Sequence, residues 1–434
     1  MSHPFAFSCS SLYHSFSFRF IRGYLTRVLD DKEEMSKAFS QSSLTPPVEI
    51  DARVHGLQRR MAEKGLALVL IIQNVDLFYF SGTLQKGYLI IPAEGEACLF
   101  VQKNYERAIH ETPLECVRLD SFKELPALVQ DHRFNGNRVG MELDVIPVSL
   151  FYRIKTLFKN WEILDVSSEI KEVRSIKSDF EIEQIHMSGR IIDEVFSQAR
   201  QYIREGVTEL VVDGTLTSIG RSHGHQGFLR MRGLNQEMMN IHVLSGESGS
   251  THSFCDTPLS GSGLSSAIAQ GSSRRRILRD QPIVIDYGGG YNGYVTDETR
   301  TFVIGRLRDP LLKAYEVALD ITGEMESSVR PGDSPMHIYE RALEKAGKAG
   351  LGENFMGHGE GKVAFVGHGL GLEINEWPIL GRAYRKPLQA GNVFAFEPKF
   401  IFPGEGAVGI ELDYVVREKG VERITSFPKE LIVL

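Results

Sequence analysis

The chain has 434 residues, 42% of them apolar and 24% charged, which is the composition of a globular protein longer than one ordinary domain. The net charge of −7 is modest and Lys and Arg cluster only at Arg274–Arg276, so we expect no nucleic-acid partner. No apolar run approaches the ~18 residues of a membrane span, so we expect no membrane association. Four cysteines without CxxC spacing favour a reducing, cytoplasmic compartment.

The N-terminal segment 1–47 is set apart from the rest by its composition. Met1–Leu29 contains no acidic residue and is rich in Ser, Phe and Arg, as in a transit peptide, although it has no secretory apolar stretch. The alternative is that translation starts at Met35 and that the upstream part is a wrongly assigned start. In both cases we expect residues 1–47 to form a tail outside the folded domains.

The next stretch alternates helical and strand patterns. A helix is predicted at 50–64, a buried strand at 66–72, a hairpin at 89–101 and the start of a further strand within 135–142. This alternation predicts an N-terminal α/β domain over residues 48–175 with a parallel or mixed sheet.

A polar, charged segment at 166–178 is the predicted domain boundary. Ser178 and Asp179 then cap a long helix with apolar residues at helical spacing, which Gly206 is expected to end. A second helix is predicted after Thr208.

Strand patterns follow, and then the arrangement repeats. Asp309-Pro310 supplies a helix N-cap and the residue favoured at the first helical position, and a fourth helix is predicted at 334–348. Strands fill the remainder. The predicted second domain, residues 176–434, therefore contains two helices followed by strands, and then two more helices followed by strands.

Four acidic residues lie inside apolar strand patterns, namely Asp286, Asp297, Glu397 and Glu411. An isolated buried carboxylate is costly unless it is paired, protonated or bound to a metal, and few Lys or Arg share these strands. Bound cations are the simplest way to stabilise these buried carboxylates. His368, in the glycine-rich VGHGLGLE, adds an imidazole, and this ligand mix suits two divalent ions such as Mn, Co or Zn. Two bridged ions would make a hydroxide nucleophile near neutral pH.

The order and spacing of these residues resemble a known family. The two Asp are 11 positions apart, His368 precedes Glu397 by 29, and Glu411 follows 14 later. The phrases NVDLFYFSG, GYVTDETRTF, GHGLGLEINEWP and FEPKFIFPG also match. Over roughly residues 50–434 the chain is similar to the pita-bread metallopeptidases, which include Xaa-Pro dipeptidase, aminopeptidase P, methionine aminopeptidase and creatinase.

The resemblance implies an α/β (α+β) protein with a C-terminal pita-bread (creatinase/aminopeptidase) fold. A creatinase/prolidase-type N-terminal α/β domain would precede it and would shape the mouth of the site. The implied substrate is a short peptide or small amide, most simply an Xaa-Pro peptide, and the implied assembly is a homodimer.

The resemblance also implies a role for each ligand. Asp286 would hold one ion, Asp297 and Glu411 would bridge both, and His368 with Glu397 would hold the other. Glu397 would also be the catalytic group that takes a proton from the nucleophilic water.

Several positions around these ligands depart from the family pattern. Gln270 and Asn375 stand where histidines are usual, Ala364 replaces another histidine, and Gly409 replaces an arginine. Gln and Asn donate hydrogen bonds but do not exchange protons near neutral pH. Gln270 and Asn375 are therefore the tentative substrate-binding residues, with Thr299, which matches a family position beside the metals or is a strand residue bonded to its neighbour.

Three functions remain open at this point. The leading one is metal-dependent hydrolysis of the amide C–N bond of an Xaa-Pro peptide. The second keeps the metals but acts on a small non-peptide amide or amidine, which the missing histidines favour. The third is a non-catalytic binding module, against which the retention of all five ligands argues.

Overall fold

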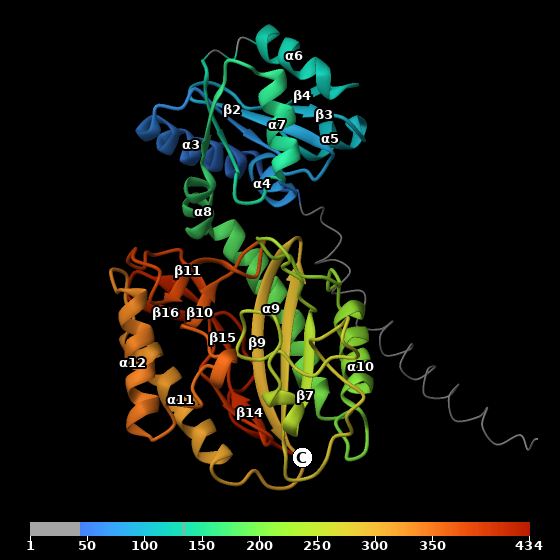
Figure 1. Ribbon diagram of the computed structural model, residues 1–434, viewed down its shortest axis with the longest axis vertical. Helices are drawn as coiled ribbons and strands as arrows, with labels where there is room; N and C mark the ends of the chain where they lie inside the picture. The colour runs from blue at the N-terminus through green and yellow to red at the C-terminus, as the bar shows by residue number, and fades with distance from the viewer. Residues whose placement is uncertain (1–43, 133, 135) are drawn as a thin grey trace, which may run out of the picture. The chain divides into compact units, whose positions relative to one another are not determined.

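The computed structural model describes residues 44–132, 134 and 136–434 (Figure 1). The predictions of a tail at 1–47 and of a start at Met35 fall mainly on residues 1–43, which lie outside the described residues; at the end of the predicted tail, Thr45 is buried and Pro47 opens the first described helix. Residues Thr45–Leu434 group into a single unit. Within the described part of the chain, no helix combines the length and apolar character needed to cross a membrane.

The first part of this unit is a mixed sheet with surrounding helices. Its six strands lie in the order β4-β3-β2-β1-β5-β6. In chain order the elements are α3 (Pro47–Lys64), β1 (Leu68–Ile71), α4 (Asn74–Ser81), β2 (Gly87–Pro92), β3 (Cys98–Val101), α5 (Tyr105–Glu111), β4 (Glu115–Arg118), η1 (Phe122–Glu124), α6 (Leu125–Asp131), β5 (Arg138–Met141), α7 (Val148–Leu157), β6 (Glu162–Asp165) and α8 (Ser167–Ser175).

The predicted helix, buried strand, hairpin and later strand are all confirmed in this part. Helix α3 begins at Pro47, because proline is well suited to the first helical turn, and it ends at Gly65 in the left-handed conformation (φ 61°). Strand β1 is buried along its whole length. The segment predicted as a domain boundary forms helix α8.

The second part contains the expected two rounds of paired helices and strands. In chain order its elements are α9 (Asp179–Ala199), α10 (Glu209–Ser222), β7 (Ile241–Ser245), η2 (Gly246–Ser250), β8 (Pro282–Tyr291), β9 (Tyr294–Val303), α11 (Leu311–Ser328), α12 (Pro335–Lys348), η3 (Gly359–Gly361), β10 (Phe365–Gly369), β11 (Glu376–Gly381), β12 (Val393–Phe396), β13 (Lys399–Phe402), β14 (Gly406–Gly409), β15 (Leu412–Arg417), β16 (Gly420–Arg423) and β17 (Ile432–Val433).

Two helix boundaries differ from the sequence prediction. The capping box of α9 forms as expected, with Ser178 Oγ accepting from the Glu181 N–H and the Glu181 carboxylate accepting from the Ser178 N–H, both at 3.2 Å. The helix ends at Ala199 instead of Gly206, because the chain turns there while Ile203 still packs into the core. Helix α11 has Pro310 as its N-cap, one residue later than predicted.

The strands of the second part form two main sheets, ordered β17-β9-β8-β7 and β11-β10-β12-β15-β16, and a short β13-β14 hairpin. Helices α9 and α10 pack on the first sheet, whereas α11 and α12 pack on strands of the others (Figure 1). The sheets meet where Thr299 and Glu411 exchange backbone hydrogen bonds of 3.4 and 3.2 Å. This junction brings the first predicted ligand, Asp286, and the last, Glu411, into one region.

Candidate metal centre

The five predicted ligands lie on strands, or directly beside strands, that converge at this junction. Asp286 lies on β8 and Asp297 on the antiparallel neighbour β9. His368 lies on β10, Glu397 directly follows β12, and Glu411 lies between β14 and β15. The two rounds of strands therefore each supply ligands, as the sequence predicts.

The imidazole of His368 faces three of the carboxylates. Its Nε2 lies 3.9 Å from Asp297 Oδ2, 3.8 Å from Glu397 Oε1 and 3.8 Å from Glu411 Oε1. Atoms of Asp297, His368 and Glu411 all lie within 4.8 Å of one another, which is close enough for one ion to contact all three. Glu411 Oε1 is buried and has no hydrogen-bond partner among the described residues, so this donor set fits a divalent cation.

A lysine completes the cluster on its other side. Lys399 is 1% exposed. Its Nζ lies 2.6 Å from Glu411 Oε2, 2.9 Å from Glu397 Oε2 and 3.3 Å from Asp286 Oδ2. The sequence argument that few basic residues share these strands therefore missed the one that pairs with three of the four carboxylates. The signal was present, because Lys399 interrupts the apolar run of FEPKFIF.

The crowding of carboxylates shifts their ionisation. Burial raises the pKa of Glu411 to about 8, although the Lys399 ammonium opposes the shift. Burial and the neighbouring Glu411 carboxylate raise the pKa of Asp297 well above its usual value. Burial would also raise the pKa of Asp286, but Lys399 beside it holds that pKa below the usual value. One internal cation is too little for four carboxylates, and a divalent ion would stabilise their ionised forms.

Two further groups hold the ligands in place. The Thr299 hydroxyl donates to Glu411 Oε2 at 2.9 Å, and Thr299 is fully buried. The Asp413 carboxylate accepts from the backbone N–H of Asp297 at 2.8 Å. Such outer partners fix the orientation of ligating side chains. Thr299, a tentative substrate-binding residue in the sequence analysis, therefore lies behind Glu411 and does not line the cavity.

The ligands open onto a cavity of about 270 Å³. Its remaining wall is largely apolar with a few polar groups, and it is formed by Leu229, Met231, Gln236, Met238, Met239, His242, Asp256, Thr257, Gly288, Phe365, Ile374, Asn375 and Ile379. A small, mostly apolar pocket with polar groups at one end is typical of a site for a small organic substrate.

The tentative substrate residues Gln270 and Asn375 lie in different places. Asn375 lines this cavity, but its amide exchanges hydrogen bonds with the backbone of Arg232, at 2.8 and 2.9 Å. Gln270 lines a neighbouring cavity with Phe254, and its amide donates to the Glu237 carbonyl at 3.0 Å. The amide groups of both are therefore engaged with the protein.

His242 is a cavity residue that the sequence analysis did not single out. It lies opposite Asp286 in the β7–β8 pairing and lines the cavity, and its Nε2 has no hydrogen-bond partner among the described residues. Burial lowers its pKa, against the attraction of the Asp286 carboxylate. The imidazole is therefore neutral at pH 7 and can accept or donate a hydrogen bond there.

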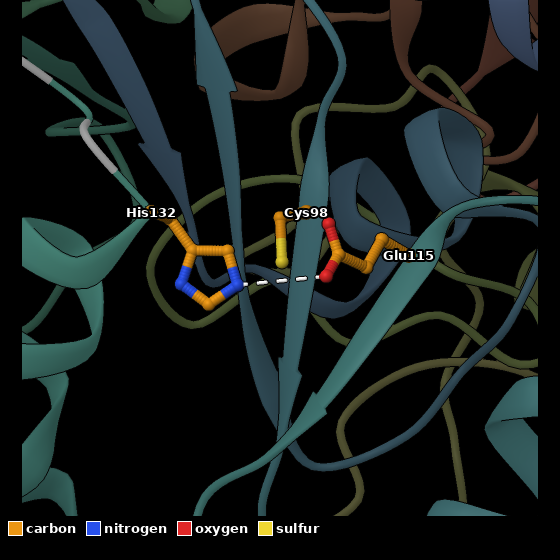
Figure 2. Close-up of side chains that lie close together, drawn as sticks. All are labelled: Cys98, Glu115 and His132. Carbon is orange, nitrogen blue, oxygen red and sulfur yellow. Dashed lines mark ion pairs between the residues drawn. The ribbon is translucent and has the colours of Figure 1, made fainter.

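A second group of metal-type side chains lies in the N-terminal sheet. Cys98, Glu115 and His132 place donor atoms within 4.8 Å of one another, and His132 Nε2 lies 3.6 Å from Glu115 Oε1 (Figure 2). Burial raises the pKa of the Cys98 thiol to about 12, which disfavours the thiolate form that binds metals. The Glu115 side chain is 62% exposed. The cluster on β8–β15 is therefore the stronger candidate for a metal centre.

Comparison with known proteins identifies the family of the chain. Residues 183–418 match the model of metallopeptidase family M24, and residues 53–176 match that of the creatinase/prolidase N-terminal domain. The first match covers more than half of the chain. The chain therefore belongs to metallopeptidase family M24, whose members depend on divalent metal ions, and it is a hydrolase with the pita-bread fold in its second part.

Individual relatives extend over nearly the whole folded region. The chain is 29% identical to the Xaa-Pro dipeptidase of Pyrococcus furiosus over 88% of this chain and 99% of the relative. Among solved structures it is similar to the Xaa-Pro dipeptidase from Bacillus anthracis, with a TM-score of 0.76 and 26% identity over 89% of this chain and 100% of the other. The X-Pro aminopeptidase from Thermotoga maritima gives a TM-score of 0.73 at 26% identity, over 88% and 99%.

Proposed function

We propose that this chain is a metal-dependent Xaa-Pro peptidase of the dipeptidase or aminopeptidase P type. The observation that carries the proposal is the convergence of four carboxylates and His368 on one cavity, with a buried Glu411 oxygen left for a cation. The named activities of the similar proteins support the choice of substrate class. The substrate would be a short peptide that enters the cavity over the metal ligands.

We propose two divalent ions, Mn, Co or Zn, as the cofactors. Asp286 would hold one, His368 and Glu397 the other, and Asp297 with Glu411 would contact both. When bound, such ions supply Lewis-acid activation of the substrate carbonyl and lower the pKa of water. The binding site for them needs no rearrangement on the His368 side, where the ligand atoms already face one another.

The side chains of the cavity have distinct tasks in this proposal. Glu397 is the catalytic proton carrier, because its carboxylate lines the cavity beside the other predicted ligands and no separate base is needed. The neutral His242 imidazole is placed to hydrogen-bond the polarised amide. The apolar wall excludes water and favours an apolar ring such as proline. Asn375 stays a candidate substrate residue in the cavity wall, whereas Gln270 lines the neighbouring cavity, and Thr299 acts through Glu411.

The test is hydrolysis of Xaa-Pro dipeptides and Xaa-Pro-Xaa tripeptides by protein reconstituted with Mn, Co or Zn. Glu397→Gln should lower turnover by at least about 100-fold, because it removes the proton acceptor. The control is Glu405→Gln, an exposed glutamate on the β13–β14 turn, which should keep wild-type activity. No turnover of any peptide by metal-loaded protein would contradict the proposal.

A non-peptide amide or amidine is the second candidate substrate. The observation that favours it is that the Asn375 amide is bonded to the Arg232 backbone and that Ala364 replaces a family histidine. Turnover of a small-amide panel without turnover of Xaa-Pro peptides would select this candidate.

The domain organisation and the assembly belong to the same proposal. We propose a tail at 1–47, an N-terminal domain at 48–175 and a catalytic domain at 176–434, assembled as a cytoplasmic homodimer. The family-model matches support the two domains. Three cysteines, Cys98, Cys116 and Cys255, are free, as suits a reducing compartment. Light scattering on the purified chain tests the dimer, and a monomer would contradict it.

A further inference from the structure

Glu397 and Glu411 each turn their two oxygens toward different side chains. Both Oε1 atoms face His368 Nε2 at 3.8 Å. Both Oε2 atoms face Lys399 Nζ, at 2.9 and 2.6 Å. The carboxylate cluster therefore has two sides, and a different group stands on each.

The His368 side offers ligand atoms, and no Lys or Arg of the described residues is ion-paired with them. Asp297 Oδ2 joins the two Oε1 atoms there, 3.9 Å from the imidazole. Glu411 Oε1 has no hydrogen-bond partner among the described residues. One imidazole nitrogen and three carboxylate oxygens make a complete set for one divalent ion.

The Lys399 side already holds a cation with its contacts complete. An ammonium group has three N–H donors, and Nζ lies within 3.3 Å of one oxygen from each of Asp286, Glu397 and Glu411. These charge-assisted hydrogen bonds are the strong kind. The Lys399 side chain is 2% exposed, so its charge cannot be solvated elsewhere without a large movement.

The backbone makes room for this lysine. Lys399 opens β13 and pairs with Gly409 on β14. A Cβ added at Gly409 would lie 2.6 Å from the Pro398 carbonyl oxygen, 2.7 Å from Lys399 Cα and 2.8 Å from Lys399 Cγ, so any larger residue would displace the β13 backbone together with the lysine stem. Gly409 is the position at which the family usually has arginine. The absence of an arginine side chain at position 409 therefore makes the room that Lys399 occupies.

We propose that the Lys399 ammonium serves as a built-in cation on the Asp286 side of the centre. The chain then binds one divalent ion tightly, on the His368 side, and a second ion enters only by displacing Lys399 from three carboxylates. The two ions of the proposed centre are thus bound with strongly unequal affinities. The inference rests on the proposed function only in that the centre binds divalent ions.

The experiment is a metal titration of the chelator-treated, full-length chain with Mn²⁺, followed by calorimetry and by elemental analysis after desalting. Wild type should retain one ion per chain, with any second binding step at least about 100-fold weaker because three charge-assisted hydrogen bonds must break. Lys399→Met, which keeps the volume and removes the charge, should bind two ions with similar affinity. Its Mn²⁺ electron paramagnetic resonance spectrum should then show spin coupling, which wild type lacks at one equivalent.

Lys177→Met is the matched control, because Lys177 is an equally buried lysine paired with a carboxylate, Glu376, outside the centre. It should bind metal like wild type. Two equal tight steps in wild type would overturn the inference, as would a folded Lys399→Met that stays at one ion. The wild-type titration decides the matter even if Lys399→Met fails to fold. Binding stoichiometry is independent of substrate, so inactivity toward Xaa-Pro peptides contradicts only the proposed function.

Discussion

At the scale of single residues, Thr299 shows how the centre depends on groups that never touch a substrate. Its hydroxyl donates to Glu411 Oε2, on the oxygen that Lys399 also contacts. Thr299→Val keeps the shape and removes the donor. We expect metal affinity to fall about 10-fold, as for other partners that orient metal ligands. Calorimetric titration with Mn²⁺ measures this.

Thr301→Val is the control for that change. Thr301 points to the same side of β9, and its hydroxyl donates to the Gly409 carbonyl and not to a ligand. It should lose stability without losing metal affinity. Equal affinities of Thr299→Val and wild type would show that the hydroxyl does not orient Glu411.

At the scale of elements, the glycines of β8 set how closely helix α9 approaches the sheet. A Cβ at Gly289 would lie 2.4 Å from Thr296 Oγ1 and 2.8 Å from Ser188 Oγ. Those two hydroxyls hydrogen-bond each other at 2.8 Å between α9 and β9. Gly289→Ala should therefore lower the free energy of unfolding by about 1–3 kcal/mol through overpacking, as measured by urea denaturation.

Gly323→Ala on α11 is the matching substitution in open space, because nothing lies within 4 Å of an added Cβ there. A helix interior prefers Ala to Gly, so this variant should gain up to about 1 kcal/mol. Equal changes in the stability of both alanine variants would show that Gly289 is not needed for the close approach of α9.

The sequence predicted the helices and strands better than the contacts between them, because the signals for helices and strands are local. The capping residues of α9 and the apolar run of β1 each act within a few positions, so periodicity and caps located them. The predicted metal ligands were singled out because carboxylates in apolar strands are rare and their spacing matches a family. Lys399 was missed, because its partners are set by how three strands converge. The Asn375–Arg232 bonds join residues 143 positions apart, and no local pattern indicates them.

At the scale of the whole molecule, a buried ionic network ties residues before 176 to residues after it. Arg174 donates to Asp76 and to Glu376, both at 2.6 Å, and Lys177 lies 3.1 Å from Glu376. Arg232 reaches Asp76 at 2.8 Å from the other side. Removing one partner of such a network leaves an unpaired buried charge, which is strongly destabilising.

The network predicts how stability depends on pH. Burial alone would raise the pKa of Glu376, but Arg174 and then Lys177 hold it at about 2, below the usual 4.5. Because the folded state lowers this pKa, the ionised carboxylate stabilises the fold above about pH 4.5, and that stabilisation is lost as the pH falls toward 2. Its size is on the order of 3 kcal/mol.

Glu376→Gln should therefore unfold at lower urea concentration than wild type at pH 7, and the difference between the two should shrink as the pH falls from about 4.5 toward 2. Urea denaturation across this range measures it, with Glu418→Gln, an exposed glutamate, as the control that should follow wild type at every pH. A difference that stayed constant with pH would mean that the lost hydrogen bonds, and not the ionised carboxylate, stabilise the contact. The charge on Glu376 would then have no part in holding residues 45–175 against the catalytic region.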